Sequence, residues 1–164
     1  MHDWNEIIAD LERQDIHRLL TRGMPEDIVA KIKLLCAAYR DVPLEERTTM
    51  RAGLPRRSSA VISIFSVHIA TVAMQQKDKA ALDLAVVAFD LSDIMRIDYR
   101  DAFGHVGRLA FAAKECGVDL MERVRALVHD ISPRFMDMLA APRFPRVVRD
   151  SEGNMVFWNP WRKQ

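Results

Sequence analysis

The sequence predicts an all-α protein of antiparallel helical pairs, about seven helices in a short solenoid or an irregular bundle, followed by a C-terminal β-hairpin. Apolar residues recur at separations of three and four through most of the first 142 residues, as in amphipathic helices. Pro142 and Pro145 then end helical structure, and two short apolar runs flank a turn that contains Gly153. We therefore expect a helical domain over residues 1–142 and a hairpin with its tail over 143–164, packed on that domain.

Start and stop signals divide the first part of the chain. We expect its first three helices at residues 3–23, 25–40 and 43–53. Asp3 or Asn5 can cap the first helix, and Gly23 ends it. Pro25 suits the first position of the second helix, where its missing amide costs no hydrogen bond.

The longest apolar run, Ala60 to Met74, spans fifteen residues. A membrane-spanning helix needs about 20 residues, so we expect a buried core helix that Ser58 or Ser59 caps. His68 lies in the middle of this run. We expect a buried neutral histidine that is bonded to a hydroxyl such as that of Thr71 or to a backbone carbonyl.

The stretch from Asp78 to Asp119 is expected to organise the fold as a tightly packed helical hairpin. Asp98 can accept from the amide of Asp101 and so cap the second helix of this pair. Glycine costs about 1 kcal/mol in a helix interior. The glycines of the second helix, with Gly104 among them, therefore indicate close approach by a neighbouring helix. A further helix is expected at residues 119–131.

The charge balance bounds the functional classes. With 24 basic and 23 acidic residues, the chain lacks the basic excess that is typical of a nucleic-acid binder. Cys36 and Cys116 are expected to be buried thiols in a reducing compartment. The chain opens without a charged region followed by an apolar run, so no export signal is indicated. We expect a cytoplasmic protein that does not bind membranes.

Between residues 60 and 130 an alanine-rich helix, a polar turn and a second helix follow one another. The residues that mark this order are Arg96, Asp98, Tyr99, Arg100 and Asp101 in the turn, and Lys114, Glu115, Cys116, Gly117, Val118 and Asp119 at the end of the second helix. In this order the sequence resembles bacterial all-helical proteins of unassigned function whose architecture is similar to HEAT or armadillo pairs. The resemblance implies a scaffold and carries no catalytic residue onto this chain.

Polar residues gather around the bend between the two central helices. We expect them to form an acidic groove that binds a protein partner or a second copy of the chain, with candidate residues Asp90, Asp93, Arg96, Asp98, Arg100, Asp101 and His105. A salt-bridge network that clamps the turn is the structural alternative. Asp101 and His105 share a helix face, but the sequence supplies no further ligand spacing of a metal site. We therefore expect no cofactor, metal ligand or catalytic residue.

Aromatic and basic residues alternate near the C-terminus. Trp158 and Trp161 lie close to Arg162 and Lys163. Packing on the helical core, docking on a protein partner and stacking on nucleobases would each use such side chains. We favour packing on the core, then a partner, with nucleic acid last.

These patterns favour a non-enzymatic protein-interaction module, and a bacterial regulatory or toxin-neutralising role would suit it by analogy. An alternative is a metal-dependent hydrolase that uses His68, His105, His129 and nearby aspartates. A second alternative is nucleic-acid binding by the C-terminal tail, which would depend strongly on salt.

Overall fold

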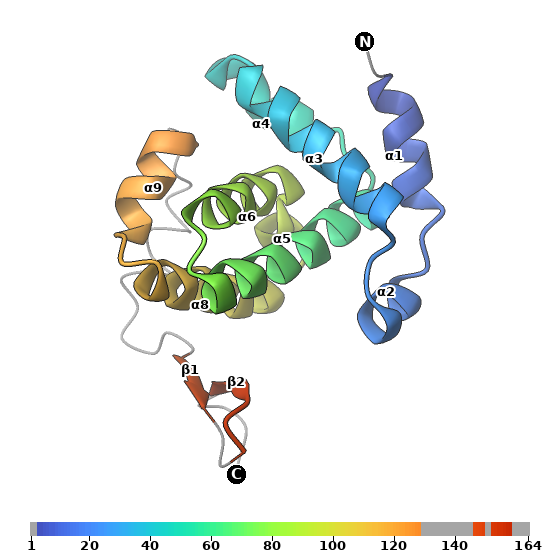
Figure 1. Cartoon of the computed structure of the whole chain (residues 1–164). Coiled ribbons are helices and arrows are strands. Elements are labelled where there is room, and N and C mark those ends of the chain that lie inside the picture. Colours follow the sequence, from blue (N-terminus) through green and yellow to red (C-terminus); the bar gives the residue numbers. More distant parts are fainter. Residues whose placement is uncertain (1–2, 129–145, 150–151, 159–164) are drawn as a thin grey trace.

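The structure is a computed structural model that describes residues 3–128, 146–149 and 152–158 (Figure 1). Its described helices are α1 (Trp4–Glu12), α2 (Ile16–Arg22), α3 (Glu26–Asp41), α4 (Leu44–Ala52), α5 (Arg56–Gln76), α6 (Lys79–Ser92), α7 (Ile94–Ile97), α8 (Tyr99–Glu115) and α9 (Leu120–Leu127). Two short strands follow, β1 (Arg146–Arg149) and β2 (Met155–Trp158).

Aspartates and prolines set the helix starts. The carboxylates of five N-cap aspartates accept backbone N–H groups of the first turn, at Asp3, Asp15, Asp78, Asp98 and Asp119. A proline lies directly before α3, α4 and α5. The predicted cap of α8 is confirmed, because Asp98 Oδ1 accepts from the amides of Arg100 and Asp101.

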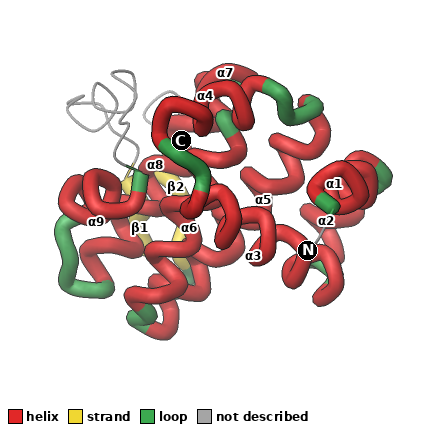
Figure 2. Tube along the Cα trace, turned by 90° about the horizontal axis from the view of Figure 1, so that it is seen from above, coloured by secondary structure: helices red, strands yellow, loops and turns green. Residues whose placement is uncertain are grey.

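Helix α5 lies at the centre of an irregular bundle. It packs most extensively against α6 and also contacts α1, α2, α3, α7 and α8, an arrangement seen from a second direction in Figure 2. Ile62 and Phe65 on α5 are fully buried. By length and composition α5 is also the one described helix that could cross a membrane. The apolar run thus forms a core helix around which the other helices assemble.

Several local expectations need correction. The predicted first helix is two helices, because Asp15 caps α2 through the Arg18 amide and so interrupts the helix after α1. Leu20 on α2 is apolar but 67% exposed. Helix α5 begins after Pro55, so Ser58 and Ser59 are buried residues within it rather than caps.

Two predicted contacts are also absent. His68 is exposed on α5, because that side of the helix is not covered by the described neighbours of the core. A Cβ added at Gly104 would meet nothing within 4 Å, so this glycine does not mark a close helix approach. Both errors arise because the helical spacing of a residue does not say which neighbouring element faces it.

The predicted fold class is corrected to all-helical. Residues 3–128 form nine helices, where about seven were expected, and contain no strand. Beyond them, β1 and β2 pair antiparallel with each other, with Val147 opposite Phe157, and form a two-stranded unit that joins no larger sheet in the described chain. Two strands of four residues cannot supply a sheet layer. β1 lies beside α8, and the predicted domain boundary at residue 142 falls outside the described residues.

Candidate functional site

The bend between α6 and α8 holds most of the candidate binding residues. Helix α6 ends at Ser92, and Asp93 adopts a left-handed conformation with φ 51°. The Ser92 hydroxyl donates to the Phe89 carbonyl at 2.7 Å and accepts from the Ile94 amide at 3.3 Å. Helix α7 fills the segment that was predicted as a polar turn, and Asp98 then caps α8. The bend is therefore fixed by local hydrogen bonds.

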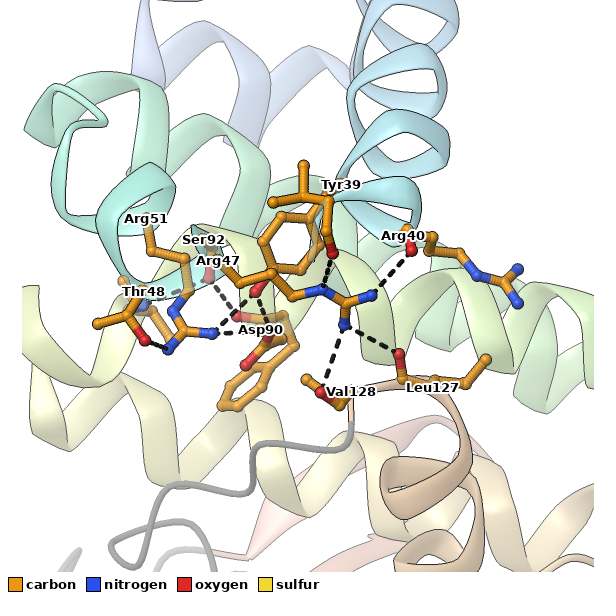
Figure 3. Close-up of polar contacts among 12 residues, drawn as sticks. Tyr39, Arg40, Arg47, Thr48, Arg51, Asp90, Ser92, Leu127 and Val128 are labelled. Atoms are coloured by element: carbon orange, nitrogen blue, oxygen red, sulfur yellow. Dashed lines mark hydrogen bonds and ion pairs between the residues drawn. The ribbon is translucent and has the colours of Figure 1, made fainter. Parts of the chain in front are cut away.

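Asp90 points toward Tyr39 and Arg51, which come from α3 and α4 (Figure 3). Its Oδ2 accepts a hydrogen bond from the Tyr39 hydroxyl and pairs with an Arg51 guanidinium nitrogen at 3.1 Å. Burial raises the pKa of the Asp90 carboxyl to about 6, against the opposing effects of Arg51 and Tyr39. This removes Asp90 from the predicted acidic groove and makes it part of an interhelical contact.

Arg51 and Tyr39 complete this contact. Arg51 donates to the Tyr39 hydroxyl at 2.8 Å and to the Thr48 hydroxyl at 3.3 Å. Burial is the main cause that raises the pKa of Tyr39, and the neighbouring Asp90 charge acts in the same direction. The Tyr39 hydroxyl thus stays protonated, accepting from Arg51 while it donates to Asp90.

Arg47 is the least exposed of the described charged residues, with 5% of its surface exposed. It lies one turn from Arg51 on α4, and its guanidinium carbon lies 5.1 Å from the centre of the Tyr39 ring. The guanidinium donates to the carbonyls of four residues, at Arg40 (2.8 Å), Val42 (3.0 Å), Leu127 (3.3 Å) and Val128 (3.3 Å). Since these carbonyls lie at the C-terminal ends of α3 and α9, Arg47 places a cation where both helix dipoles favour one.

Arg47 and Arg51 were not among the functional residues predicted from the sequence. One signal was present, because the two arginines are four positions apart and so share a face of the short helix that begins after Pro43. An arginine pair on a polar helix is usually a solvated surface. Burial of Arg47 could not be inferred without its acceptors, which lie 80 and 81 positions away at Leu127 and Val128.

The other residues of the bend lie at the surface. Asp93 pairs with Arg96 at 2.8 Å, in the clamp that was the structural alternative for this turn. Asp98, Arg100 and Asp101 are exposed. We call Asp98 and Asp101 the α8 acidic pair. Partial burial and then the nearby Asp98 charge raise the pKa of Asp101, while Arg108 opposes them. Within the described chain no ion pair reaches either carboxylate of this pair.

His105 is directed to α5. Its Nδ1 lies 2.9 Å from the Ser63 hydroxyl, and its ring meets the Phe89 ring edge-on with the centroids 6.4 Å apart. Burial lowers the pKa of His105 to about 4, and the Arg108 charge adds to this effect. His105 is therefore a neutral histidine that is satisfied by a serine, although it shares a helix face with Asp101.

The other predicted residues are the possible metal ligands, the tail aromatics and the two cysteines. No group of three or more histidine, cysteine, aspartate or glutamate side chains in the described ranges could hold a metal ion. His129 of the hydrolase alternative and Trp161 of the tail lie outside the described residues. Trp158 lies at the end of β2. The predicted buried thiols are confirmed, since Cys36 and Cys116 are both free and buried.

Comparison of the chain with protein-family models, with curated proteins and with solved structures finds no match.

Proposed function

We propose that this chain is a non-enzymatic protein-interaction module that binds a basic segment of a protein partner at the α8 acidic pair. The observation that carries this proposal is the mutual placement of Asp98 and Asp101 at the exposed start of α8. Partial burial and then the Asp98 charge raise the pKa of Asp101, while Arg108 opposes them, so the two carboxylates repel one another in the free protein. A lysine or arginine of a partner would relieve this repulsion.

The surroundings of the pair favour a preformed site. Asp98 is held in place because its carboxylate accepts two backbone amides of α8. The neighbouring arginine Arg96 is already paired with Asp93, so it does not neutralise the pair. A rigid acidic position on a helical scaffold contributes mainly to the specificity and association rate of a partner. Asp90 belongs to the interior and is no longer part of the proposed surface.

Charge removal without loss of the helix cap tests the proposal. Asparagine caps a helix about as well as aspartate, so Asp98→Asn with Asp101→Asn removes two charges and keeps the start of α8. We expect this double variant to bind the partner roughly two- to thirtyfold more weakly, because it removes two exposed ion pairs that contribute about 0.2–1 kcal/mol each. The measurement is affinity capture from an extract of the native host, followed by titration of the captured protein at two salt concentrations.

The chain offers a matched control at α9. Asp119 caps α9 as Asp98 caps α8, and Glu122 follows in its exposed first turn. Asp119→Asn with Glu122→Gln therefore removes the same charge from an equivalent helix start. The control should capture the partner like the unmodified chain. Equal capture by the Asp98 and Asp101 variant would contradict the proposal.

A further inference from the structure

Helix α4 is attached to the rest of the protein mainly by polar side chains. Arg47 is its only buried residue, and Leu44 at its start is 42% exposed. No other described element makes extensive backbone contact with α4. Its apolar anchors are Met50, which is partly buried, and Leu54 just beyond its end. The docking of α4 therefore depends mainly on the polar contacts that Arg47 and Arg51 make.

Those two arginines contact three other helices. Arg51 meets Asp90 on α6 and Tyr39 on α3, and Arg47 meets the ends of α3 and α9 (Figure 3). We call Tyr39, Arg47, Arg51 and Asp90 the α4 cluster. The same short helix thus carries one arginine that holds a buried carboxylate and, one turn away, another that holds the C-terminal end of α9.

We propose that α4 is a proton-sensitive latch on α9. Asp90 sets how firmly Arg51 holds α4 against α6, and Arg47 carries this attachment to the carbonyls of Leu127 and Val128. The C-terminal end of α9 is coupled in this way to a single carboxyl on α6. This goes beyond the proposed partner binding, which uses carboxylates at the start of α8.

The electrostatic surroundings fix the direction of the effect. Among described residues, the groups that act on Asp90 and Arg51 are Tyr39 from α3, Arg47 from α4, and Asp93 from the junction of α6 and α7. Helix α9 adds backbone carbonyls rather than a titratable side chain to these bonds. In the docked state burial raises the Asp90 pKa to about 6. When α4 undocks, the carboxyl meets water and its pKa returns to about 4.

The docked state therefore binds a proton more tightly than the undocked state. Docking is strongest below about pH 4, where Asp90 is neutral in both states, and it weakens as the pH rises through about 6. The neutral carboxyl keeps an oxygen that accepts from Tyr39 or Arg51, so protonation does not dissolve the α4 cluster. Protonation removes the free-energy cost of holding an ionised carboxylate away from water.

Hydrogen exchange of the full chain, read by mass spectrometry at pH 5 and pH 7.5 and corrected for intrinsic exchange rates, tests the latch. The two pKa values predict that peptides from α4 and from the end of α9 are about tenfold more protected at pH 5. Asp90→Asn replaces the carboxyl by a neutral side chain of the same shape and should remove this pH dependence. Unchanged pH dependence in Asp90→Asn would overturn the proposal.

Asp83→Asn is the matched control, because Asp83 is also an α6 carboxylate that pairs with an arginine, here Arg123 of α9 at 2.7 Å. This variant should lower the protection of α9 by the same factor at both pH values. Arg47→Met tests transmission: α4 should keep its pH dependence while α9 loses it. A pH dependence of α9 that survives Arg47→Met would overturn the coupling, and if this variant does not fold, the Asp90→Asn measurement still decides.

Discussion

Asp90 on α6 accepts a hydrogen bond from the hydroxyl of Tyr39 on α3, 51 positions earlier in the chain. The same carboxylate oxygen pairs with Arg51 of α4. One carboxylate oxygen therefore links three helices that are separate in sequence. This contact turns an aspartate near the central bend into an interior residue.

Replacement of Tyr39 by phenylalanine should lower the free energy of unfolding by about 1–3 kcal/mol. The change keeps the buried ring but removes the hydroxyl that donates to Asp90 and accepts from Arg51. Urea denaturation at pH 7 measures the loss. Thr71→Val is the control, because the Thr71 hydroxyl donates only to the Val67 carbonyl of its own helix. Equal losses in the two variants would contradict a special role for Tyr39.

Replacement of Arg47 by methionine should cost about 2–4 kcal/mol of unfolding free energy. Methionine fills similar space but leaves carbonyls at the ends of α3 and α9 without their donor. Chemical denaturation gives the value. Arg57→Met supplies the comparison, since exposed Arg57 makes a single 3.3 Å bond to the Glu12 carbonyl and its loss should change stability by less than about 0.5 kcal/mol. A similar cost at both arginines would show that burial of Arg47 contributes nothing.

Asp90 and His105 should produce opposite slopes of stability against pH. The folded pKa of Asp90 lies above its unfolded value, so its contribution is present below about pH 4 and is lost as the pH rises through about 6. The folded pKa of His105, about 4, lies below the usual 6.5, so its contribution is full above about 6.5 and falls as the pH drops toward 4. Between these limits the two effects partly cancel.

Variants separate the two contributions. In urea denaturation between pH 4 and pH 6.5, Asp90→Asn should make the free energy of unfolding rise more steeply with pH than in the unmodified chain. His105→Gln should shift the slope in the opposite direction, since it removes the group that favours higher pH. Parallel pH profiles for both variants and the unmodified chain would show that neither group titrates differently on folding.

Alanine at position 104 should stabilise the protein by about 0.5–1 kcal/mol. Gly104 lies within α8, and its added Cβ would meet nothing within 4 Å, so only the helix propensity and the unfolded-chain entropy change. Thermal unfolding should show a midpoint a few degrees higher. Gly117→Ala should do the reverse, because Gly117 has φ 71° in the left-handed region. If Gly104→Ala destabilised the protein, that result would support the close helix approach that was predicted from the sequence.

Local chemistry predicted much of the helical framework but not its interior polar contacts. The Asp98 cap and the proline before α3 act through neighbours within three residues, so they are visible in sequence. The partners of Asp90 lie 51 and 39 positions away, and no periodicity points to them. An aspartate near the end of a helix resembles an ordinary surface residue. Its burial follows from the packing of α3 and α4 on α6, which is a tertiary property.

The same reason explains why the surroundings of the two histidines could not be predicted from the sequence. His68 lies within the most apolar run yet is exposed, whereas His105 shares a helix face with the exposed Asp101 yet faces Ser63 of α5. Sequence spacing places each on a helix face but does not say which face another helix covers.

The bonds from Arg47 to Leu127 and Val128 also constrain how the chain is made. Because these acceptors come 80 and 81 residues later, the guanidinium has none of its α9 partners when α3 and α4 first leave the ribosome. The contact between α4 and α9 can therefore form only after α9 has emerged. Completion of the Arg47 contacts is therefore timed by translation of a segment about half a chain length downstream.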